Sequence, residues 1–477
     1  MLVLSQFMEK ILIFIKVPQN AFLVFGGIFG FLFVFLVPPI QVYDERVHFF
    51  QAYAVSNLDF IQDKHEYNGK YHYGSELPRS VYVAGEVFIA NTAGHAETKF
   101  DKHLYRVFIK QPLEPSIIES RESGTGYSPV VYIPQAIGIT VGKIFNSSPL
   151  IMIWLGRFMS LLVWLAVIYL AIKIIPFGKW AMAILALNPM AVFLSASLSA
   201  DVITTSLSFL FFSLVASAFI STKVLTKKRL ITMLAVLALL SLTKPTAVLF
   251  GILLFAIPIK RFGKKLTYVL VSIGGIIGSV AIVLIWSHLT ADANELTSQA
   301  QSVGRVVNPS LQLSGILHDP LHYIKTLFIN YVVVPPGYEG DHVLASTVGA
   351  LGWGETHIPL WTVLLYGVMV FLALLSTLRE KVNINKFQKI TLISVLIVFI
   401  VANITAMYLY FTGVGKDVIV GVQGRYFIPG CVLLIGLFTS KKKLFRMSDE
   451  ALILILGVGM LIVLGITSII ILLRYYV

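Results

Sequence analysis

The sequence has little charge and almost no cysteine. Only 13% of its 477 residues are Asp, Glu, Lys or Arg, whereas about a quarter is typical of soluble domains. Cys431 is the single cysteine, which excludes an intrachain disulfide and a cysteine-based metal site. The sequence also lacks heptads, internal repeats and low-complexity tails, which excludes coiled coils and solenoids.

Long apolar runs dominate the chain instead. Hydrophobic residues make up 57% of the sequence, and the mean hydropathy is +0.83. Several runs reach the roughly 20 residues that a helix needs to cross a bilayer. They are continuous rather than alternating, which excludes a transmembrane β-barrel. The first run, 21–37, is not followed by a small-x-small cleavage site, so we expect a retained anchor. These features predict an all-α polytopic membrane protein with one integral membrane domain over 1–477.

Basic residues give the expected topology. The net charge of +13 is explained by basic cytoplasmic loops rather than by nucleic-acid binding. With a cytoplasmic N-terminus, the loops on that side hold 20 of the 37 Lys and Arg residues and four of the 24 acidic ones. This arrangement predicts about 11 transmembrane helices, over 20–39, 148–172, 180–198, 202–221, 230–243, 246–259, 266–287, 360–378, 390–411, 426–440 and 451–473.

Two large extracytoplasmic loops follow from this topology, 41–147 and 288–359. All ten histidines lie in or beside them. Residues 130–145 could form a further span, which would move every later basic loop outside. We favour a helix in the membrane interface, because this stretch is short and contains Pro134, Gln135 and Lys143. Residues 311–334 are interpreted in the same way.

An acidic pair, Asp44 and Glu45, opens the first loop directly after a membrane helix. Charge at such a position has either a partner or a chemical role. Adjacent helical positions diverge by about 100°, so one carboxylate would face a site and the other would support the fold. A carboxylate in a partly dry site can act as a general base. The alternatives are a helix cap near Val47 or a pair with Arg46. His48 could orient a carboxylate or join it in holding a divalent metal, which we do not favour because no second ligand cluster accompanies it.

Three further charged positions are candidates for phosphate or substrate binding. Arg425, followed by Tyr426, enters the tenth span after flexible glycines and suits a phosphate, although snorkelling to headgroups explains it too. Lys244 precedes Pro245 in an outer hairpin and suits a phosphate or the interface. Asp201 lies in an outer turn, where it resembles a helix N-cap.

Aromatic and polar residues beside these positions suit the wall of a lipid or sugar site. Tyr127, Tyr132 and Gln135 belong to a proline-rich segment. Trp353 could stack on a sugar ring beside Glu355, or it could anchor a turn in an aromatic belt.

At this point the sequence resembles the GT-C class of membrane glycosyltransferases, such as protein O-mannosyltransferases and aminoarabinose transferases. The acidic motif 44–49, the proline-rich segment 127–137 and the late Gly-Arg-Tyr element 424–426 carry the resemblance. It is also similar to a bacterial family of predicted GT-C-like polytopic membrane proteins. In that family, Asp-Glu-x-x-His-Phe, Ser-x-Asp (199–201), Lys-Pro, Gly-Trp and Gln-Gly-Arg-Tyr elements recur in this order over nearly the whole length.

The resemblance implies an inverting glycosyltransferase of the plasma membrane, with its active site on the extracytoplasmic face. Asp44 would be the catalytic base, supported by Glu45, although the residues alone leave open which carboxylate is the base. The donor would be a sugar on a polyprenyl-phosphate carrier, and Arg425 with Lys244 would stabilise the leaving phosphate. No cofactor is implied. The acceptor would be a glycan or lipid of the cell envelope, recognised by the loops or by a partner protein.

Two other functions remain open. A flippase or transporter of lipid-linked sugars would place its polar residues near the bilayer midplane, whereas here they lie at the outer rim. A polymerase or ligase of polyprenyl-linked glycans would use an oligosaccharide donor, and the sequence is equally compatible with this function and with transfer of a single sugar.

Overall fold

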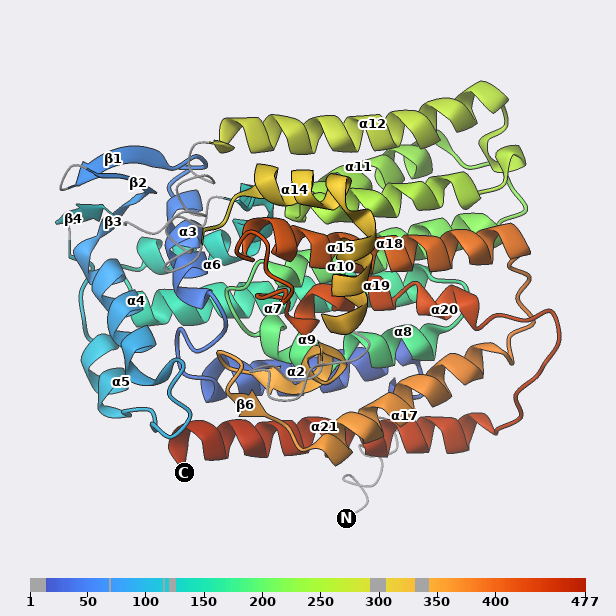
Figure 1. Ribbon diagram of the computed structural model, residues 1–477. Coiled ribbons are helices and arrows are strands. Elements are labelled where there is room, and N and C mark those ends of the chain that lie inside the picture. The colour runs from blue at the N-terminus through green and yellow to red at the C-terminus, as the bar shows by residue number, and fades with distance from the viewer. Residues whose placement is uncertain (1–13, 68–69, 115, 120–125, 292–305, 331–342) are drawn as a thin grey trace, which may run out of the picture.

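The helices run back and forth along one direction and form an elongated bundle (Figure 1). The computed structural model describes residues 14–67, 70–114, 116–119, 126–291, 306–330 and 343–477. Within these residues, seven helices are long and apolar enough to cross a membrane. They are α2 (Pro18–Leu36), α7 (Pro149–Ile174), α10 (Asp201–Ile220), α12 (Lys265–Leu289), α17 (Leu360–Thr377), α18 (Lys386–Tyr410) and α21 (Asp449–Tyr476). The chain is therefore an all-α membrane protein, as expected.

The other four expected spans form helices that are short or interrupted. The structure therefore does not confirm the predicted number of 11 transmembrane helices. Prolines explain most of the interruptions, because proline lacks the N–H donor and disfavours helix in the residue before it. Asn188-Pro189 splits one span, Lys244-Pro245 separates two, and Pro429 lies in the last. The resulting pieces are α8 (Lys179–Ala186), α9 (Pro189–Ser195), α11 (Lys227–Thr243), the 3-10 helices η2 (Pro245–Ala256) and η5 (Gly424–Phe427), α19 (Ile428–Cys431) and α20 (Leu434–Leu437).

The basic loops gather at one end of the bundle, on the right of Figure 1. We call this the basic end; it comprises residues 173–179, 221–229, 257–265 with the 3-10 helix η3 (Ile259–Phe262), 378–389 and 438–449. Backbone hydrogen bonds join these loops: Leu225 N donates to Arg261 O at 2.7 Å, and Leu444 N donates to Leu378 O at 3.3 Å. The segregation of basic residues that the sequence predicted is therefore a property of the fold.

The segment 41–147 covers the opposite end, which we call the site end. It contains helices and, unlike the purely helical expectation, short antiparallel strands: β1 pairs with β2 (Asp63↔Gly74), and β3 pairs with β4 (Glu76↔Glu119). Helix α6 covers most of 130–145 and packs along α7, while its expected place in the membrane interface stays a prediction. At Gly138, a Cβ atom would lie 2.3 Å from the Leu155 carbonyl oxygen, so glycine is what lets α6 pack directly on α7. The elements are α3 (Glu45–Val55), β1 (Asp63–Tyr67), β2 (Lys70–Gly74), β3 (Glu76–Pro78), α4 (Arg79–Thr92), α5 (His103–Phe108), β4 (Ile117–Glu119), η1 (Pro129–Tyr132) and α6 (Ile133–Ile144).

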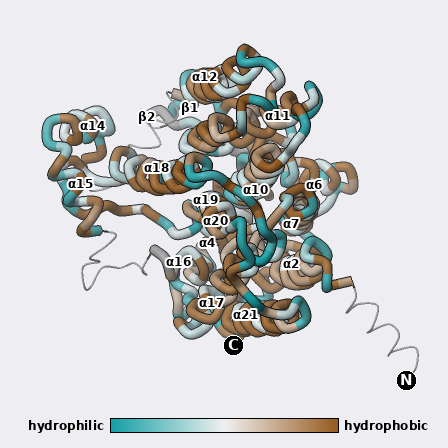
Figure 2. Tube along the Cα trace, turned by 90° about the vertical axis from the view of Figure 1, so that its right-hand side faces the viewer, coloured by the Kyte–Doolittle hydropathy of each residue, from teal (hydrophilic) through white to brown (hydrophobic). Residues whose placement is uncertain are grey.

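The second expected loop, 288–359, is described in part. Residues 292–305 and 331–342 lie outside the described residues, so the prediction for 311–334 is tested only up to 330. Its elements are α14 (Pro309–His318), α15 (Pro320–Phe328), α16 (Val343–Gly349) and the paired strands β5 (Ala350–Leu351) and β6 (Thr356–His357). Helices α14 and α15 stand out from the bundle beside α18 (Figure 2). Gln312 fixes α14 there by donating to the carbonyls of Tyr408, Thr412 and Gly413 at 3.2 Å each.

Burial divides the helices into a centre and an apolar shell. In α10, 83% of an 18-residue apolar stretch is buried inside the protein, whereas in α12 the buried share of such a stretch is 22%. Figure 2 shows hydrophobic residues on the outer faces of the peripheral helices. On α12 these include Leu266, Leu270, Ile277 and Leu284, all more than 60% exposed. This pattern is the one expected when lipid surrounds the bundle and α10 forms its core.

Candidate functional site

Asp44 lies in the turn between α2 and α3, and it immediately precedes the first residue of α3. Its backbone is left-handed, with φ 58°, a conformation that aspartate tolerates better than most residues. The side chain is 53% exposed, and its Oδ2 atom accepts a hydrogen bond from Arg425 Nη2 at 2.9 Å. The fold thus brings together two predicted site residues that are 381 positions apart in the chain.

The neighbouring carboxylate, Glu45, is completely buried against Arg157. Arg157 Nε and Nη2 donate to the two Glu45 carboxylate oxygens at 2.8 and 2.6 Å. Its remaining N–H groups donate to backbone carbonyls at the end of α2, those of Val34, Val37 and Pro38. All five guanidinium donors are therefore used. Glu45 also accepts from Leu198 N at 3.1 Å, so this pair joins α2, α3, α7 and the loop before α10.

Arg425 is another buried arginine of this end, and it is held by a tight backbone crossing. It belongs to η5, whose first residue, Gly424, lies so close to α16 that a Cβ atom would come within 2.1 Å of Thr347 N. Its ring neighbours are Tyr43 and Tyr426, with centroids 5.0 and 5.5 Å from the guanidinium carbon. Arg425 is 4% exposed. Burial by itself would lower the pKa of Arg425, but Asp201, Tyr426 and Asp44 raise it above its usual value, so the side chain stays cationic.

The donors of Arg425 are used incompletely, in contrast to those of Arg157. Among the described residues, Arg425 Nε and Nη1 have no hydrogen-bond partner, although both atoms are buried. Nε lies 3.3 Å from Asp201 Oδ2 as an ion pair without hydrogen-bond geometry. Buried donors without a partner cost free energy, and in native proteins they commonly await a water, an ion or a ligand.

Asp201 and Lys244 complete a cluster of four charges with Asp44 and Arg425. The expected helix-capping role of Asp201 is wrong: Ala200 is the N-cap of α10, and no side chain caps the helix. The Asp201 carboxylate instead contacts Lys244 Nζ at 2.5 Å and the Arg425 guanidinium. Lys244 Nζ also lies 4.3 Å from the centre of the Tyr426 ring. Each residue sits where a helix begins or ends, because the interruptions of the bundle meet here.

His48 lies one turn beyond Asp44 on α3 and is buried. Its Nδ1 atom is 2.8 Å from the Tyr132 hydroxyl, and its ring centroid is 5.5 Å from that of Tyr127. Burial and, to a lesser degree, Arg425 lower the pKa of His48 to about 4, against the opposing effect of Asp44, Asp201 and Glu45. The imidazole is therefore neutral at pH 7, and it orients its neighbours by hydrogen bonding rather than by charge.

We expect His48 to make stability fall on acidification. The pKa of His48 is about 4 in the folded chain and 6.5 when unperturbed, so between these values the unfolded state binds a proton that the folded state does not. The melting temperature should therefore drop between pH 7 and pH 4.5, and less so in His48→Asn, which keeps a polar atom near Tyr132. The control is His103→Asn on the exposed surface, which should follow the wild type. An identical acid drop in the His48 variant would contradict the buried neutral imidazole.

Trp353 and Glu355 lie beside Tyr43 at the edge of the cluster. The Trp353 ring centroid is 5.8 Å from that of Tyr43, and its Nε1 atom donates to Ile40 O at 3.4 Å. Glu355 accepts from Trp353 N at 2.6 Å and pairs with Arg474 at 3.2 Å. Glu355 thus stabilises the β5–β6 turn. Trp353 packs against Tyr43, the ring that contacts the Arg425 guanidinium. Burial raises the pKa of Tyr43 to about 12, so its hydroxyl stays protonated.

The predicted aromatic and amide residues lie at different depths. Tyr132 and Gln135 are fully buried, and Gln135 Nε2 donates to Ser199 O at 3.4 Å, close to the start of α10. Tyr127 is partly exposed. Tyr127 is therefore the member of this group that can touch a bound molecule directly.

A polar cavity of about 350 Å³ adjoins Tyr127. Gln51, which lines the cavity, lies on the same face of α3 as His48, about one turn further along the helix. Gln62 Nε2 donates to Gln51 Oε1 at 2.5 Å, and the buried Gln62 Oε1 has no partner among the described residues. The lining consists of Gln51, Phe60, Ile61, Gln62, Tyr73, Tyr127, His288, Leu289, Thr290 and Ala291.

Arg157, Tyr43, Gln51 and Gln62 were not among the site residues predicted from the sequence. A lone arginine within the apolar run 149–174 was a usable signal, since intramembrane charge requires a partner. The spacing of Asp44, His48 and Gln51 was another. As for metals, no group of three or more His, Cys, Asp or Glu side chains in the described part of the chain is arranged to hold an ion.

Comparison with known proteins places the chain in a family. No curated protein and no solved structure matches it. Residues 25–434 match the family described as "Predicted membrane protein (DUF2142)". This match extends from α2 to α20 and includes every member of the four-charge cluster. The chain therefore belongs to the DUF2142 family of predicted membrane proteins.

Proposed function

We propose that the chain is a GT-C-type glycosyltransferase that moves a sugar from a polyprenyl-phosphate carrier to a hydroxyl of a cell-envelope polymer or lipid. The observation that carries this proposal is the contrast between two of the buried arginines at the site end, Arg157 and Arg425. Arg157 uses all its donors within the fold, whereas Arg425 keeps unpartnered nitrogens beside the half-exposed carboxylate of Asp44. A planar guanidinium with free donors suits phosphate oxygens. A carboxylate next to it suits proton abstraction.

The charges of the cluster fit one inverting displacement. The acceptor oxygen bonds to the anomeric carbon, the bond from that carbon to the phosphate oxygen breaks, and the acceptor proton passes to Asp44. The electron pair of the broken bond stays on the lipid phosphate, which gains one negative charge as Asp44 loses one. Arg425, released from Asp44, and Lys244 would then stabilise the phosphate where charge develops. Asp201 holds both cations and would remain ionised.

The location of the cluster supports a lipid-linked donor. It lies at the site end, where short and interrupted helices meet, and irregular backbone beside membrane helices is found where protein or a polar site surrounds it. The opposite end carries the basic loops, which favours a cytoplasmic basic end and an extracytoplasmic site end. We propose a multi-pass plasma-membrane topology on this basis. Trp353 and Tyr43 would form the aromatic wall beside the sugar.

The polar cavity is the proposed acceptor side of the site. Gln51 lies seven residues from Asp44, roughly 10 Å along the helix, which is about the length of two sugar units. We expect Gln62→Met to raise the KM for acceptor about tenfold, since a lost hydrogen bond to a sugar hydroxyl costs on the order of 1 kcal/mol or more. Slow hydrolysis of the donor without acceptor should be unchanged. An unchanged acceptor KM would exclude the cavity from the acceptor path.

The direct test uses the purified chain in proteoliposomes with a panel of polyprenyl-phosphate sugars and cell-envelope acceptors. The expected result is release of polyprenyl phosphate together with an equal amount of glycosylated acceptor, both measured by mass spectrometry. Movement of an intact donor between leaflets, without cleavage, would replace the proposal by a flippase. Activity only with an oligosaccharide donor would indicate a polymerase or ligase. Activity that disappears in EDTA would add a divalent metal to the mechanism.

A further inference from the structure

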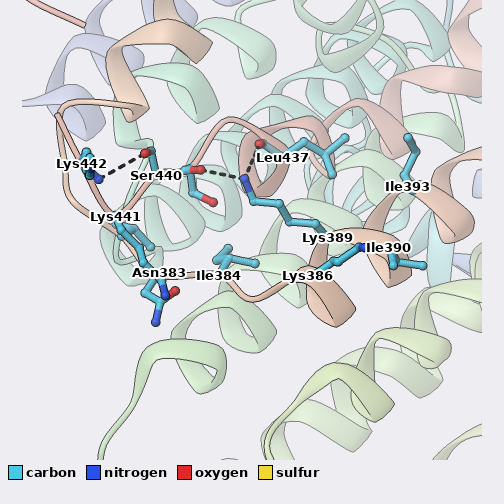
Figure 3. Close-up of a pocket in the computed structure, with 12 residues that line it drawn as sticks. Asn383, Ile384, Lys386, Lys389, Ile390, Ile393, Leu437, Ser440, Lys441 and Lys442 are labelled. Carbon is cyan, nitrogen blue, oxygen red and sulfur yellow. Dashed lines mark hydrogen bonds between the residues drawn. The ribbon is translucent and has the colours of Figure 1, made fainter. Parts of the chain in front are cut away.

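A second cavity lies at the basic end of the bundle (Figure 3). Its volume is about 630 Å³. It lies between the start of α18, the end of α20 and the loop that follows α20. Both lysines and aliphatic side chains line it. The lining residues are Val382, Asn383, Ile384, Lys386, Lys389, Ile390, Ile393, Leu437, Thr439, Ser440, Lys441 and Lys442.

The four lysines differ in how their charge is used. Lys389 Nζ donates to the carbonyls of Leu437 and Thr439 at 3.0 and 2.7 Å, which fixes the end of α20. Lys386, Lys441 and Lys442 are exposed, and none forms an ion pair with an acidic side chain among the described residues. Three free ammonium groups around one cavity give a concentrated positive potential, which favours an anion with more than a single contact.

The apolar part of the cavity continues into an exposed aliphatic stripe on α18. Ile390 and Ile393 belong to the lining, and Ile397 and Val401 follow at helical spacing. Their side chains are 50%, 44%, 54% and 38% exposed. The helix therefore presents an exposed apolar track that begins among the lysines and continues along α18 toward the site end.

We propose that this cavity is a binding site for the headgroup of an anionic phospholipid whose acyl chains lie along the stripe of α18. A phosphate fits the free lysines, and the aliphatic track fits an acyl chain in the adjoining bilayer. Basic pockets beside membrane helices are a recognised type of headgroup site. A free phosphate ion would use the lysines but not the stripe, which separates the two sources experimentally. The proposal does not depend on the glycosyltransferase chemistry of the site end.

The test measures lipid binding to the purified full chain in detergent by native mass spectrometry and by the shift in melting temperature. Probes are dioleoyl phosphatidylglycerol, dioleoyl phosphatidylcholine and inorganic phosphate. The test variant is Lys386→Gln/Lys441→Gln/Lys442→Gln. The matched control is Lys227→Gln/Lys228→Gln/Lys260→Gln, which removes the same charge from the same end but outside the cavity. A second variant, Ile393→Glu, blocks the start of the stripe and leaves the lysines in place.

Wild type and control should bind phosphatidylglycerol in preference to phosphatidylcholine, with little response to phosphate. The test variant should lose roughly fivefold in affinity for each lysine, or on the order of a hundredfold in total, since a lysine near an anionic surface contributes about 1 kcal/mol. Ile393→Glu should weaken the same lipid at least tenfold. An equal loss in the control would show general surface attraction and overturn the site. An equal response to inorganic phosphate would reduce it to a free-anion site, which also overturns the proposal.

Discussion

Replacing Asp44 by asparagine is expected to reduce the rate of sugar transfer by roughly 10²–10⁴-fold, the usual contribution of a general base. Asparagine has nearly the same shape, and its amide oxygen can still accept from Arg425 Nη2, the contact now made at 2.9 Å. The variant therefore removes the proton acceptor and leaves the position of the arginine largely unchanged. The measurement is polyprenyl-phosphate release per unit time at saturating donor and acceptor.

The control for this variant is Glu86→Gln. Glu86 is a carboxylate of α4 that pairs with Arg46 at 2.8 Å, so it also contacts the start of α3, but it is not part of the four-charge cluster. Its variant should keep near wild-type activity. Full activity in Asp44→Asn would remove Asp44 from the mechanism. A variant that loses donor affinity but keeps its maximal rate would leave Asp44 as an orienting partner of Arg425 only.

The sequence predicted the long spans well and the interruptions poorly. Seven expected spans correspond to helices within a few residues at each end, because a continuous apolar run of that length has few alternatives to a membrane-spanning helix. The other four runs are equally apolar, but prolines at 189, 245 and 429 break or bound them. Hydropathy indicates which segments leave water, but it does not predict where a helix is interrupted. The backbone bends are what place the charged residues at the site end.

Four charged residues of the candidate site were predicted, but the contacts between their side chains were not. The residue patterns singled out Asp44, Asp201, Lys244 and Arg425 one by one, each with a structural alternative, and the family resemblance joined Asp44, Arg425 and Lys244 in one expected active site. Only the fold shows that Asp201 contacts both cations instead of capping α10, and that Asp44 reaches Arg425. These contacts join segments more than forty residues apart, and a single sequence contains no signal for such pairing. The expected division of the acidic pair is matched by the geometry, with Asp44 exposed and Glu45 buried, while the catalytic roles stay predictions.

Arg157 leads to the largest expected effect on stability. Arg157→Met should destabilise the chain by about 3–5 kcal/mol, the usual result of leaving one member of a buried ion pair without its partner. Glu45 would be left with only the N–H groups of Val42 and Leu198 as donors. The carbonyls at the end of α2 would lose their donors as well. The free energy of unfolding, measured in mixed micelles, is the readout.

The partner variants make this prediction specific. Glu45→Gln/Arg157→Met removes both charges and keeps an acceptor for Leu198 N, so the double variant should recover part of the stability lost in Arg157→Met. Strictly additive losses would show that the two residues act independently, contrary to their 2.6 and 2.8 Å contacts. Arg46→Met is the matched control, because its partner Glu86 is 36% exposed and such pairs contribute about 1 kcal/mol or less. The Arg157 variant should also lose sugar transfer below its unfolding transition, since Glu45 links the start of α3 to the loop before α10 and so sets the distance between Asp44 and Asp201.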